Sequence, residues 1–171
     1  SLSILEFKGE VDVGIAERML RHPLLGEERP DAWTVRLAQE INMTSDNKLF
    51  RTKPATGLRP LFEGKMIWQF ESHFSEPRYW VDLQQTRKNV LGKTRDEGQV
   101  LAYQTYRLVF RAVGENTNER NMIATVLPPL CFCGHSSIVM ANVLAKVTYP
   151  LYLCGVLNSF VVDYTLRMKM T

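Results

Sequence analysis

The sequence lacks the motifs that most often mark a catalytic or cofactor site. It has no glycine-rich phosphate loop after a strand, no G-x-S-x-G turn and no H-E-x-x-H pair. Cys131, Cys133 and His135 form a metal-like cluster, but no second pair of ligands is available to complete a structural zinc site. We therefore expect no metal site and no catalytic residue in this chain, and a free-standing hydrolase is the weakest of the functions considered.

Cysteine and long apolar runs are scarce as well. The three cysteines are an odd number, which argues against a disulfide framework and favours a reducing cytoplasm. The most apolar run, residues 147–164, contains Asn158, Ser159 and Asp163, so it is a poor membrane span. No signal peptide is recognisable at the start. We expect a cytoplasmic protein with no membrane partner, and the abrupt ends predict a fragment of a longer protein.

Composition and charge indicate an ordinary globular domain with a basic middle. The 171 residues are 45% hydrophobic and 23% charged, which fits one domain over residues 1–171. Residues 1–50 hold six Lys and Arg against nine Asp and Glu, residues 51–120 hold twelve against eight, and residues 121–171 hold three against one. The basic middle fits a polyanionic partner, although a merely solvated surface explains the same charge.

Hydrophobic periodicity predicts an α/β fold of the mixed α+β kind. Apolar residues recur at helical spacing in residues 11–21 and most clearly in residues 150–169. We expect these helices to flank a twisted, mostly antiparallel sheet that contains a hairpin around residues 114–119. A long loop over residues 42–58 indicates a functional segment. The expected strands are residues 33–41, 64–70, 79–83, 105–113 and 120–127, and residues 137–147 fit either a strand or a helix.

Two of these strands carry polar, basic residues on one face. Alternation in the first places Lys65 and Gln69 on the face opposite Trp68, and alternation in the second places Arg107 and Arg111 together. Arginine side chains suit phosphate groups and base edges. A half-exposed sheet with solvated arginines is the competing interpretation.

A polar turn between the last two predicted strands gathers hydrogen-bond donors. Asn116, Asn118 and Arg120 place amide and guanidinium groups within five residues. Such side chains read adenine and guanine edges through paired hydrogen bonds. Asn also favours turns for local backbone reasons, so both interpretations stay open.

Several segments, taken in order along the chain, resemble one protein family. They are Pro60-Leu61-Phe62-Glu63-Gly64-Lys65-Met66-Ile67, Gln69-Phe70, Tyr79-Trp80-Val81, Phe110-Arg111, Thr117-Asn118-Glu119-Arg120, Leu127-Pro128-Pro129 and residues 157–164. Over residues 10–169 the chain resembles the C-terminal target recognition (specificity) domain of bacterial N6-adenine DNA methyltransferases of the type II and type IIG restriction–modification kind. Each motif is weak alone, and the ordered combination carries the resemblance.

The resemblance implies that recognition and catalysis lie in different domains. In such enzymes an upstream Rossmann-like domain binds S-adenosylmethionine, and its N-P-P-Y/F motif holds the flipped adenine. Here Pro128 and Pro129 lie between two leucines, so they are not that motif. The implied partners are double-stranded DNA and the upstream methyltransferase domain, and the S-adenosylmethionine belongs to that domain rather than to this chain. Whether the parent also carries a restriction endonuclease stays open.

The resemblance also implies which residues meet DNA. We expect Lys65 and Arg111 to contact phosphates, and the turn at Asn118 to act as a scaffold or a reader. Residues shared by enzymes that read different sequences suit structure or phosphate contact, so residues 42–58 and 86–99 are the expected reader loops. The alternative is a protein-interaction or scaffolding domain of a multisubunit DNA-processing enzyme. The expected DNA-binding residues are Lys65, Gln69, Arg107, Arg111, Asn116, Asn118 and Arg120.

Overall fold

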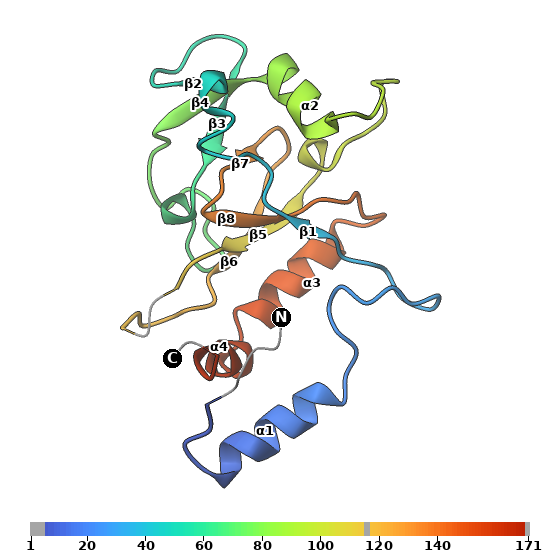
Figure 1. Ribbon diagram of the computed structural model, residues 1–171, viewed down its shortest axis with the longest axis vertical. Coiled ribbons are helices and arrows are strands. Elements are labelled where there is room, and N and C mark those ends of the chain that lie inside the picture. Colours follow the sequence, from blue (N-terminus) through green and yellow to red (C-terminus); the bar gives the residue numbers. More distant parts are fainter. Residues whose placement is uncertain (1–5, 115–116, 170–171) are drawn as a thin grey trace.

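The mixed α/β class is confirmed by the computed structural model, which describes residues 6–114 and 117–169 (Figure 1). Within these residues the chain forms two four-stranded sheets and four α-helices, rather than helices around one continuous sheet. The helices are α1 (Glu10–Leu20), α2 (Leu83–Leu91), α3 (Thr148–Leu157) and α4 (Phe160–Arg167), and the short 3-10 helices are η1 (Asn47–Leu49), η2 (Gly64–Met66) and η3 (Ala102–Gln104).

The first sheet is antiparallel throughout and has the strand order β1-β8-β5-β6. Its strands are β1 (Leu37–Ala38), β8 (Ser137–Met140), β5 (Arg107–Arg111) and β6 (Ala124–Leu127). Helix α3 packs on β5 and β6, where Leu153 and Leu157 join Leu108 in one apolar cluster. The predicted hairpin is confirmed as the β5–β6 pair, in which Arg107 lies opposite Leu127.

The second sheet has the order β2-β4-β3-β7, and only its β3–β7 pair is parallel among the described strands. Its strands are β2 (Phe50–Arg51), β4 (Tyr79–Asp82), β3 (Leu58–Phe62) and β7 (Phe132–Cys133). Helix α2 follows β4 directly, and the Asp82 carboxylate caps it by accepting from the Gln85 N–H at 2.9 Å. Leu61, Val81 and Tyr103 form the apolar cluster of this half.

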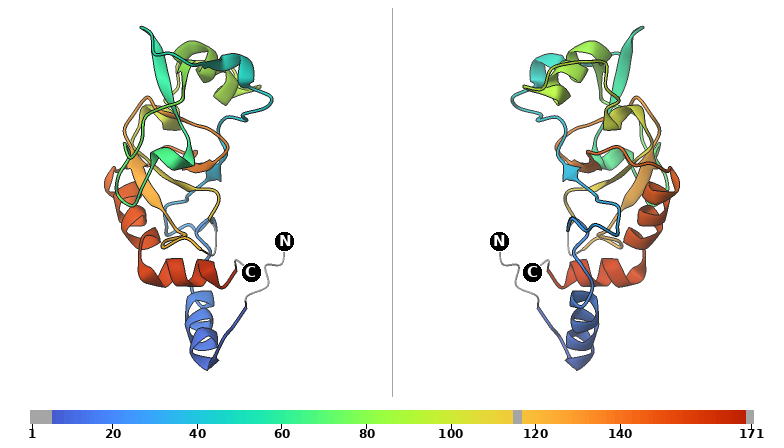
Figure 2. Two further views of the ribbon diagram at one scale, coloured as in Figure 1. Left: turned by 90° about the vertical axis from the view of Figure 1, so that its left-hand side faces the viewer. Right: turned by 90° about the vertical axis from the view of Figure 1, so that its right-hand side faces the viewer.

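A third apolar cluster joins the two sheets. Phe62, Met66 and Ile67 come from the second sheet and η2, and they pack with Val109 and Val139 of the first sheet. Figure 2 shows the resulting elongated arrangement, with α1 and α4 at one end and the second sheet with α2 at the other. In the described ranges, 6–114 and 117–169, no helix has the length and apolar character needed to cross a bilayer.

The strand predicted over residues 64–70 is wrong. Residues 64–66 form η2, and Met66 and Ile67 are consecutive and both buried, so the predicted alternation of one apolar face and one polar face does not hold here. Gly64 permits this path because its Cα lies close to the first sheet, where an added Cβ would sit 2.7 Å from the Ser136 carbonyl oxygen. The chain then turns sharply at Phe70, whose φ of 64° is left-handed.

The helix predicted over residues 150–169 is interrupted in the middle. Helix α3 ends at Leu157, and Ser159 begins α4 as an extended N-cap whose hydroxyl accepts from the Val162 N–H. Asn158 lies at the break and uses both ends of its amide on the backbone of Ala124 in β6. The break therefore fastens the two helices to the first sheet.

The other element predictions have mixed outcomes. The helix over residues 11–21 and the strands over 79–83 and 105–113 are confirmed as α1, β4 and β5. The strand expected over 33–41 is reduced to β1, with an isolated bridge at Ile41. Within the other predicted segments, β6 fills only the end of residues 120–127, residues 137–147 begin with the strand β8, and residues 42–58 contain η1, β2 and the first residue of β3.

Candidate nucleic-acid interface

Arg107, expected on a solvent-facing strand surface, is instead a buried residue. Its side chain is 1% exposed, and its guanidinium donates to both carboxylate oxygens of Glu40 at 2.7 and 3.0 Å and to the Cys131 carbonyl at 2.7 Å. Burial alone would lower the pKa of Arg107, but the Glu40 charge raises it above its usual value. The predicted polar face is wrong here, because alternation cannot detect an ion partner 67 residues away. The geometry leaves this guanidinium no free surface for a phosphate.

Arg111 also points inward and organises the segment after η2. Its Nε donates to the Gly64 carbonyl and its Nη2 to the Ile67 carbonyl, both at 2.8 Å. The guanidinium also lies 4.9 Å from the centre of the Trp68 ring, a cation–π arrangement. Burial lowers the pKa of Arg111. Its visible role is to hold η2 and the turn that follows against β5.

The turn between β5 and β6 is fastened to α4 by one carboxylate. Asp163 accepts from the backbone N–H groups of Asn121 and Met122 at 2.7 Å each, and from Arg167 Nε at 3.1 Å. Burial would raise the pKa of Asp163, but the hydrogen bonds from Met122 and Arg167 outweigh it and lower that pKa. The helical carboxylate thus acts as an anchor for the hairpin.

The predicted turn residues also take part in the contacts between the hairpin and α4. Arg167 donates to the backbone carbonyls of Asn118 and Glu119, and Arg120 donates to the Asn158 carbonyl. The Arg120 guanidinium lies 4.4 Å from the centre of the Phe160 ring. Asn116, the third predicted residue of this turn, lies outside the described residues.

Gln69 is a neighbour of Arg120 and Asn158. Its amide is 3.3 Å from Asn158 Oδ1, and with its oxygen turned the other way it accepts from Arg120 at 3.1 and 3.3 Å. The fold therefore brings Gln69, Arg120 and Asn158 together from the post-η2 turn, the hairpin and the helix break. These residues of the family resemblance meet as a structural junction.

Lys65 is a predicted residue whose cationic head is exposed and only loosely paired. Its side chain is 57% exposed, and Nζ is 3.9 Å from Glu63, which also accepts from Arg78 at 2.9 Å. An exposed, loosely paired ammonium remains available to a phosphate. Lys65 lies beside Gly64, so the close packing of that glycine fixes the backbone from which the ammonium projects.

A basic surface that residue patterns did not single out lies around β2 and β3. From residue 47 to residue 62 the sequence holds Lys48, Arg51, Lys53 and Arg59 and no acidic residue. Lys48, Arg51 and Lys53 are exposed and form no ion pair within residues 6–114 and 117–169. The feature of the sequence that could have identified this surface is the run of residues 47–62, which has four basic residues and no acidic one. We call Lys48, Arg51 and Lys53 the β2 cation cluster.

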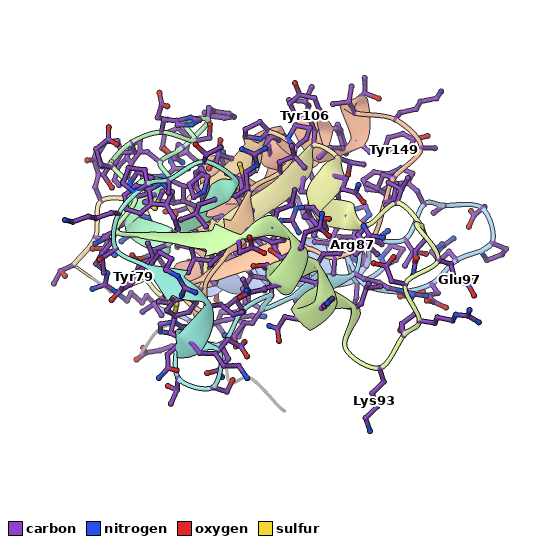
Figure 3. The ribbon with its side chains drawn as sticks, turned by 90° about the horizontal axis from the view of Figure 1, so that it is seen from above. Tyr79, Arg87, Lys93, Glu97, Tyr106 and Tyr149 are labelled. Carbon is purple, nitrogen blue, oxygen red and sulfur yellow. The ribbon has the colours of Figure 1, made fainter. Side chains whose placement is uncertain are left out.

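The second expected reader loop is held rigidly at the same end of the molecule. Arg87 of α2 donates to both oxygens of Asp96 at 2.7 Å, and it also donates to the Gln99 carbonyl at 2.9 Å. The Arg87 pair lowers the pKa of Asp96 to about 2 and raises the pKa of Arg87. Figure 3 shows Lys93 projecting from this loop at the rim of the molecule, whereas Arg87 lies inside it.

The two expected reader loops therefore share one end of the protein (Figure 1). The hydrogen bonds of Arg107, Arg111 and Arg120 place these predicted residues at internal junctions instead. In the part of the chain that the structure describes, no group of three or more His, Cys, Asp or Glu residues is arranged to hold a metal ion. A scan of protein families finds no match for this chain, and a search of curated proteins finds none either.

Proposed function

We propose that this chain grips double-stranded DNA as the target recognition part of an adenine-N6 DNA methyltransferase. The observation that carries the proposal is the β2 cation cluster, which lies on the same end of the molecule as the rigid loop with Lys93. Exposed cations that form no ion pair within the described residues suit phosphates, which contribute much of the affinity for DNA. Loops positioned by a rigid scaffold suit base reading.

The proposal assigns different roles to the arginines and lysines named from the sequence. Lys65 and the β2 cation cluster contact phosphates, because their charged heads face solvent. Arg107 and Arg111 support the surface from inside, because their guanidinium groups are committed to Glu40 and to backbone carbonyls. S-adenosylmethionine and the methyl transfer belong to a separate domain of the parent enzyme in this proposal.

A charge-neutralising variant tests the proposal. Lys48→Gln, Arg51→Gln and Lys53→Gln together remove three exposed cations. Each phosphate contact contributes a slope of about −0.9 to the dependence of log K on log salt, so we expect the slope to become shallower by up to about 3. Fluorescence anisotropy with a labelled duplex, at salt concentrations from about 50 to about 200 mM, measures the slope.

A matched control removes the same charge elsewhere. Arg18→Gln, Arg21→Gln and Lys146→Gln change three exposed cations that lie outside the second sheet, and we expect the duplex affinity of this variant to stay close to that of the unmodified protein. Duplex binding that is insensitive to salt, or an equal loss in both triple variants, would contradict the proposal.

A protein-interaction role is the second candidate, and one feature favours it. At the end opposite the β2 cation cluster, Val11, Leu20 and Phe160 expose large apolar side chains from α1 and α4. A hollow of about 660 Å³ opens between Ile15 of α1, the turn at Arg120 and α4. Exposed apolar groups of this kind fit a protein partner. Retention of partner binding by the protein without any duplex binding would favour this candidate.

A further inference from the structure

Phe70 occupies a backbone conformation that ordinarily belongs to glycine. It is the third residue of a tight turn in which Trp68 N donates to Glu71 O at 2.8 Å and Glu71 N donates to Trp68 O at 3.2 Å. Its φ is 64°, and its own N–H donates to the Ala124 carbonyl of β6 at 3.0 Å. A side chain with a Cβ is disfavoured in this region, whereas glycine is not. The surrounding hydrogen bonds therefore hold Phe70 in a strained position.

The Phe70 side chain adds little to the stability of the fold. The side chain is 68% exposed, although three backbone hydrogen bonds fix the turn from which it projects. The neighbouring Trp68 is held between Arg111, at 4.9 Å, and Phe74, at 5.2 Å between ring centres. Leu130, with a φ of 66°, is also left-handed, but it packs against the apolar cluster of the second sheet. Strain combined with exposure indicates a role outside the fold.

We propose that Phe70 is an apolar wedge that inserts between base pairs of the bound duplex; this inference rests on the proposed function. Proteins that bend DNA use single apolar side chains in this way, and such a side chain must project from a rigid backbone. The turn meets that requirement, because Trp68 and Glu71 pair on either side of Phe70.

The surroundings of Phe70 fit a nucleic acid. Lys65 extends an exposed ammonium from the same segment, whereas the Gln69 amide next to the wedge is used at the junction with Asn158 and Arg120. The nearby acid, Glu71, is turned back to accept from the His73 N–H at 3.0 Å. Figure 1 shows the β2–β3 connection and η2 on the same side of the molecule. The proposal therefore has one duplex meeting both the β2 cation cluster and the turn that follows η2.

A mismatch assay tests the wedge without knowledge of the recognised sequence. Inserting a side chain costs less where a base pair is already weakened, so we expect the protein to prefer a duplex with one 2-aminopurine–cytosine mismatch over the matched duplex. We also expect 2-aminopurine fluorescence to rise on binding as the base unstacks. Phe70→Gly should abolish both effects and weaken binding to the mismatched duplex about tenfold.

Three further results separate the explanations. Phe70→Trp keeps a flat apolar ring and should retain the mismatch preference, whereas Phe70→Asn tolerates the left-handed backbone and should lose it. The denaturation midpoint of Phe70→Gly should equal or exceed that of the unmodified protein, since glycine relieves the strain, and a lower midpoint would overturn the proposal by showing a packing role. Duplex affinity, mismatch preference and fluorescence unchanged in Phe70→Gly would also overturn it.

Different results would contradict the proposed function and the wedge. If the unmodified protein binds no duplex at any salt concentration, both fail. If it binds duplex in a salt-sensitive way and Phe70→Gly binds identically, only the wedge fails. Loss of association with a methyltransferase domain in Phe70→Gly, with duplex binding intact, would instead assign Phe70 to a protein contact.

Discussion

Arg107 of β5 and Glu40 form a buried ion pair with two hydrogen bonds, at 2.7 and 3.0 Å. Glu40 also accepts from the Cys133 N–H at 2.9 Å, and Arg107 donates to the Cys131 carbonyl. β5 belongs to the first sheet and Cys133 to the second, so this charge network ties the two sheets together.

Arg107→Ala should destabilise the protein strongly. Removing one partner leaves the Glu40 carboxylate buried without its counter-ion, which typically costs about 3–5 kcal/mol. Urea unfolding followed by tryptophan fluorescence measures the change in the free energy of unfolding. Arg36→Ala is the control, because the Arg36–Glu28 pair is about 70% exposed on both sides and such pairs contribute about 0–1 kcal/mol. Equal losses in the two variants would refute the structural role of Arg107.

Two glycine substitutions should change stability in opposite directions. At Gly64 a Cβ would meet the Ser136 carbonyl oxygen at 2.7 Å, so Gly64→Ala forces η2 away from the first sheet and lowers the free energy of unfolding. Gly155 lies in the exposed part of α3 with no heavy atom within 4 Å of an added Cβ, so Gly155→Ala should raise it by up to about 1 kcal/mol. Thermal unfolding of both variants gives the comparison; a neutral Gly64→Ala would contradict the close contact.

Local periodicity predicted the elements whose pattern is determined by their own residues. Helix α1, strand β4 and the β5–β6 hairpin were found because their apolar residues recur at the spacing of a helix or a strand, although both faces of β5 are partly buried. It failed at η2, because Met66 and Ile67 are buried on two sides by packing from the other sheet. Helix α2 was missed because its segment is short and most of its residues are polar.

The candidate site was harder to predict than the fold. Periodicity assigned Arg107 to an outer face, since Glu40 and β7 are distant in sequence and become neighbours only in the folded chain. The left-handed backbone of Phe70 leaves no mark in the sequence, because phenylalanine there looks like part of a strand. The expected reader loops are residues 42–58 and 86–99, and their polarity and length were enough to identify them in the sequence. That they read bases stays a prediction.

The three cysteines should be unreactive in the folded protein. All three are free and buried; burial raises the pKa of Cys131 to about 11 and raises those of Cys133 and Cys154. The thiolate is the reactive form, so a thiol reagent such as dithionitrobenzoate at pH 8 should react slowly with native protein. Unfolding in guanidinium should release all three rapidly. Fast reaction of one thiol in the native protein would contradict the burial of that side chain.

Acidification should loosen the loop that Arg87 clamps. The hydrogen bonds from Arg87 and from the Gly98 N–H lower the pKa of Asp96 to about 2, from an ordinary 3.8. A carboxylate whose pKa is lower in the folded state stabilises that state fully above the unfolded pKa, and the contribution disappears as the pH falls through the folded pKa. The contribution of this pair is therefore present at pH 6 and declines between about pH 4 and pH 2.

Asp96→Asn isolates this effect from general acid unfolding. The variant should melt at a lower temperature than the unmodified protein at pH 6, and the difference should shrink as the pH falls toward about 2, where the Asp96 carboxylate becomes protonated. Exchange of the Gly98 N–H, which donates to Asp96 at 3.0 Å, should accelerate in the variant at pH 6. Asp31→Asn is the control, since the Arg29–Asp31 pair is exposed, with side-chain exposures of 43% and 70%, and should show little such difference. A melting difference for Asp96→Asn that stays constant from pH 6 to about pH 2 would show that the Arg87–Asp96 charge pair does not hold the loop.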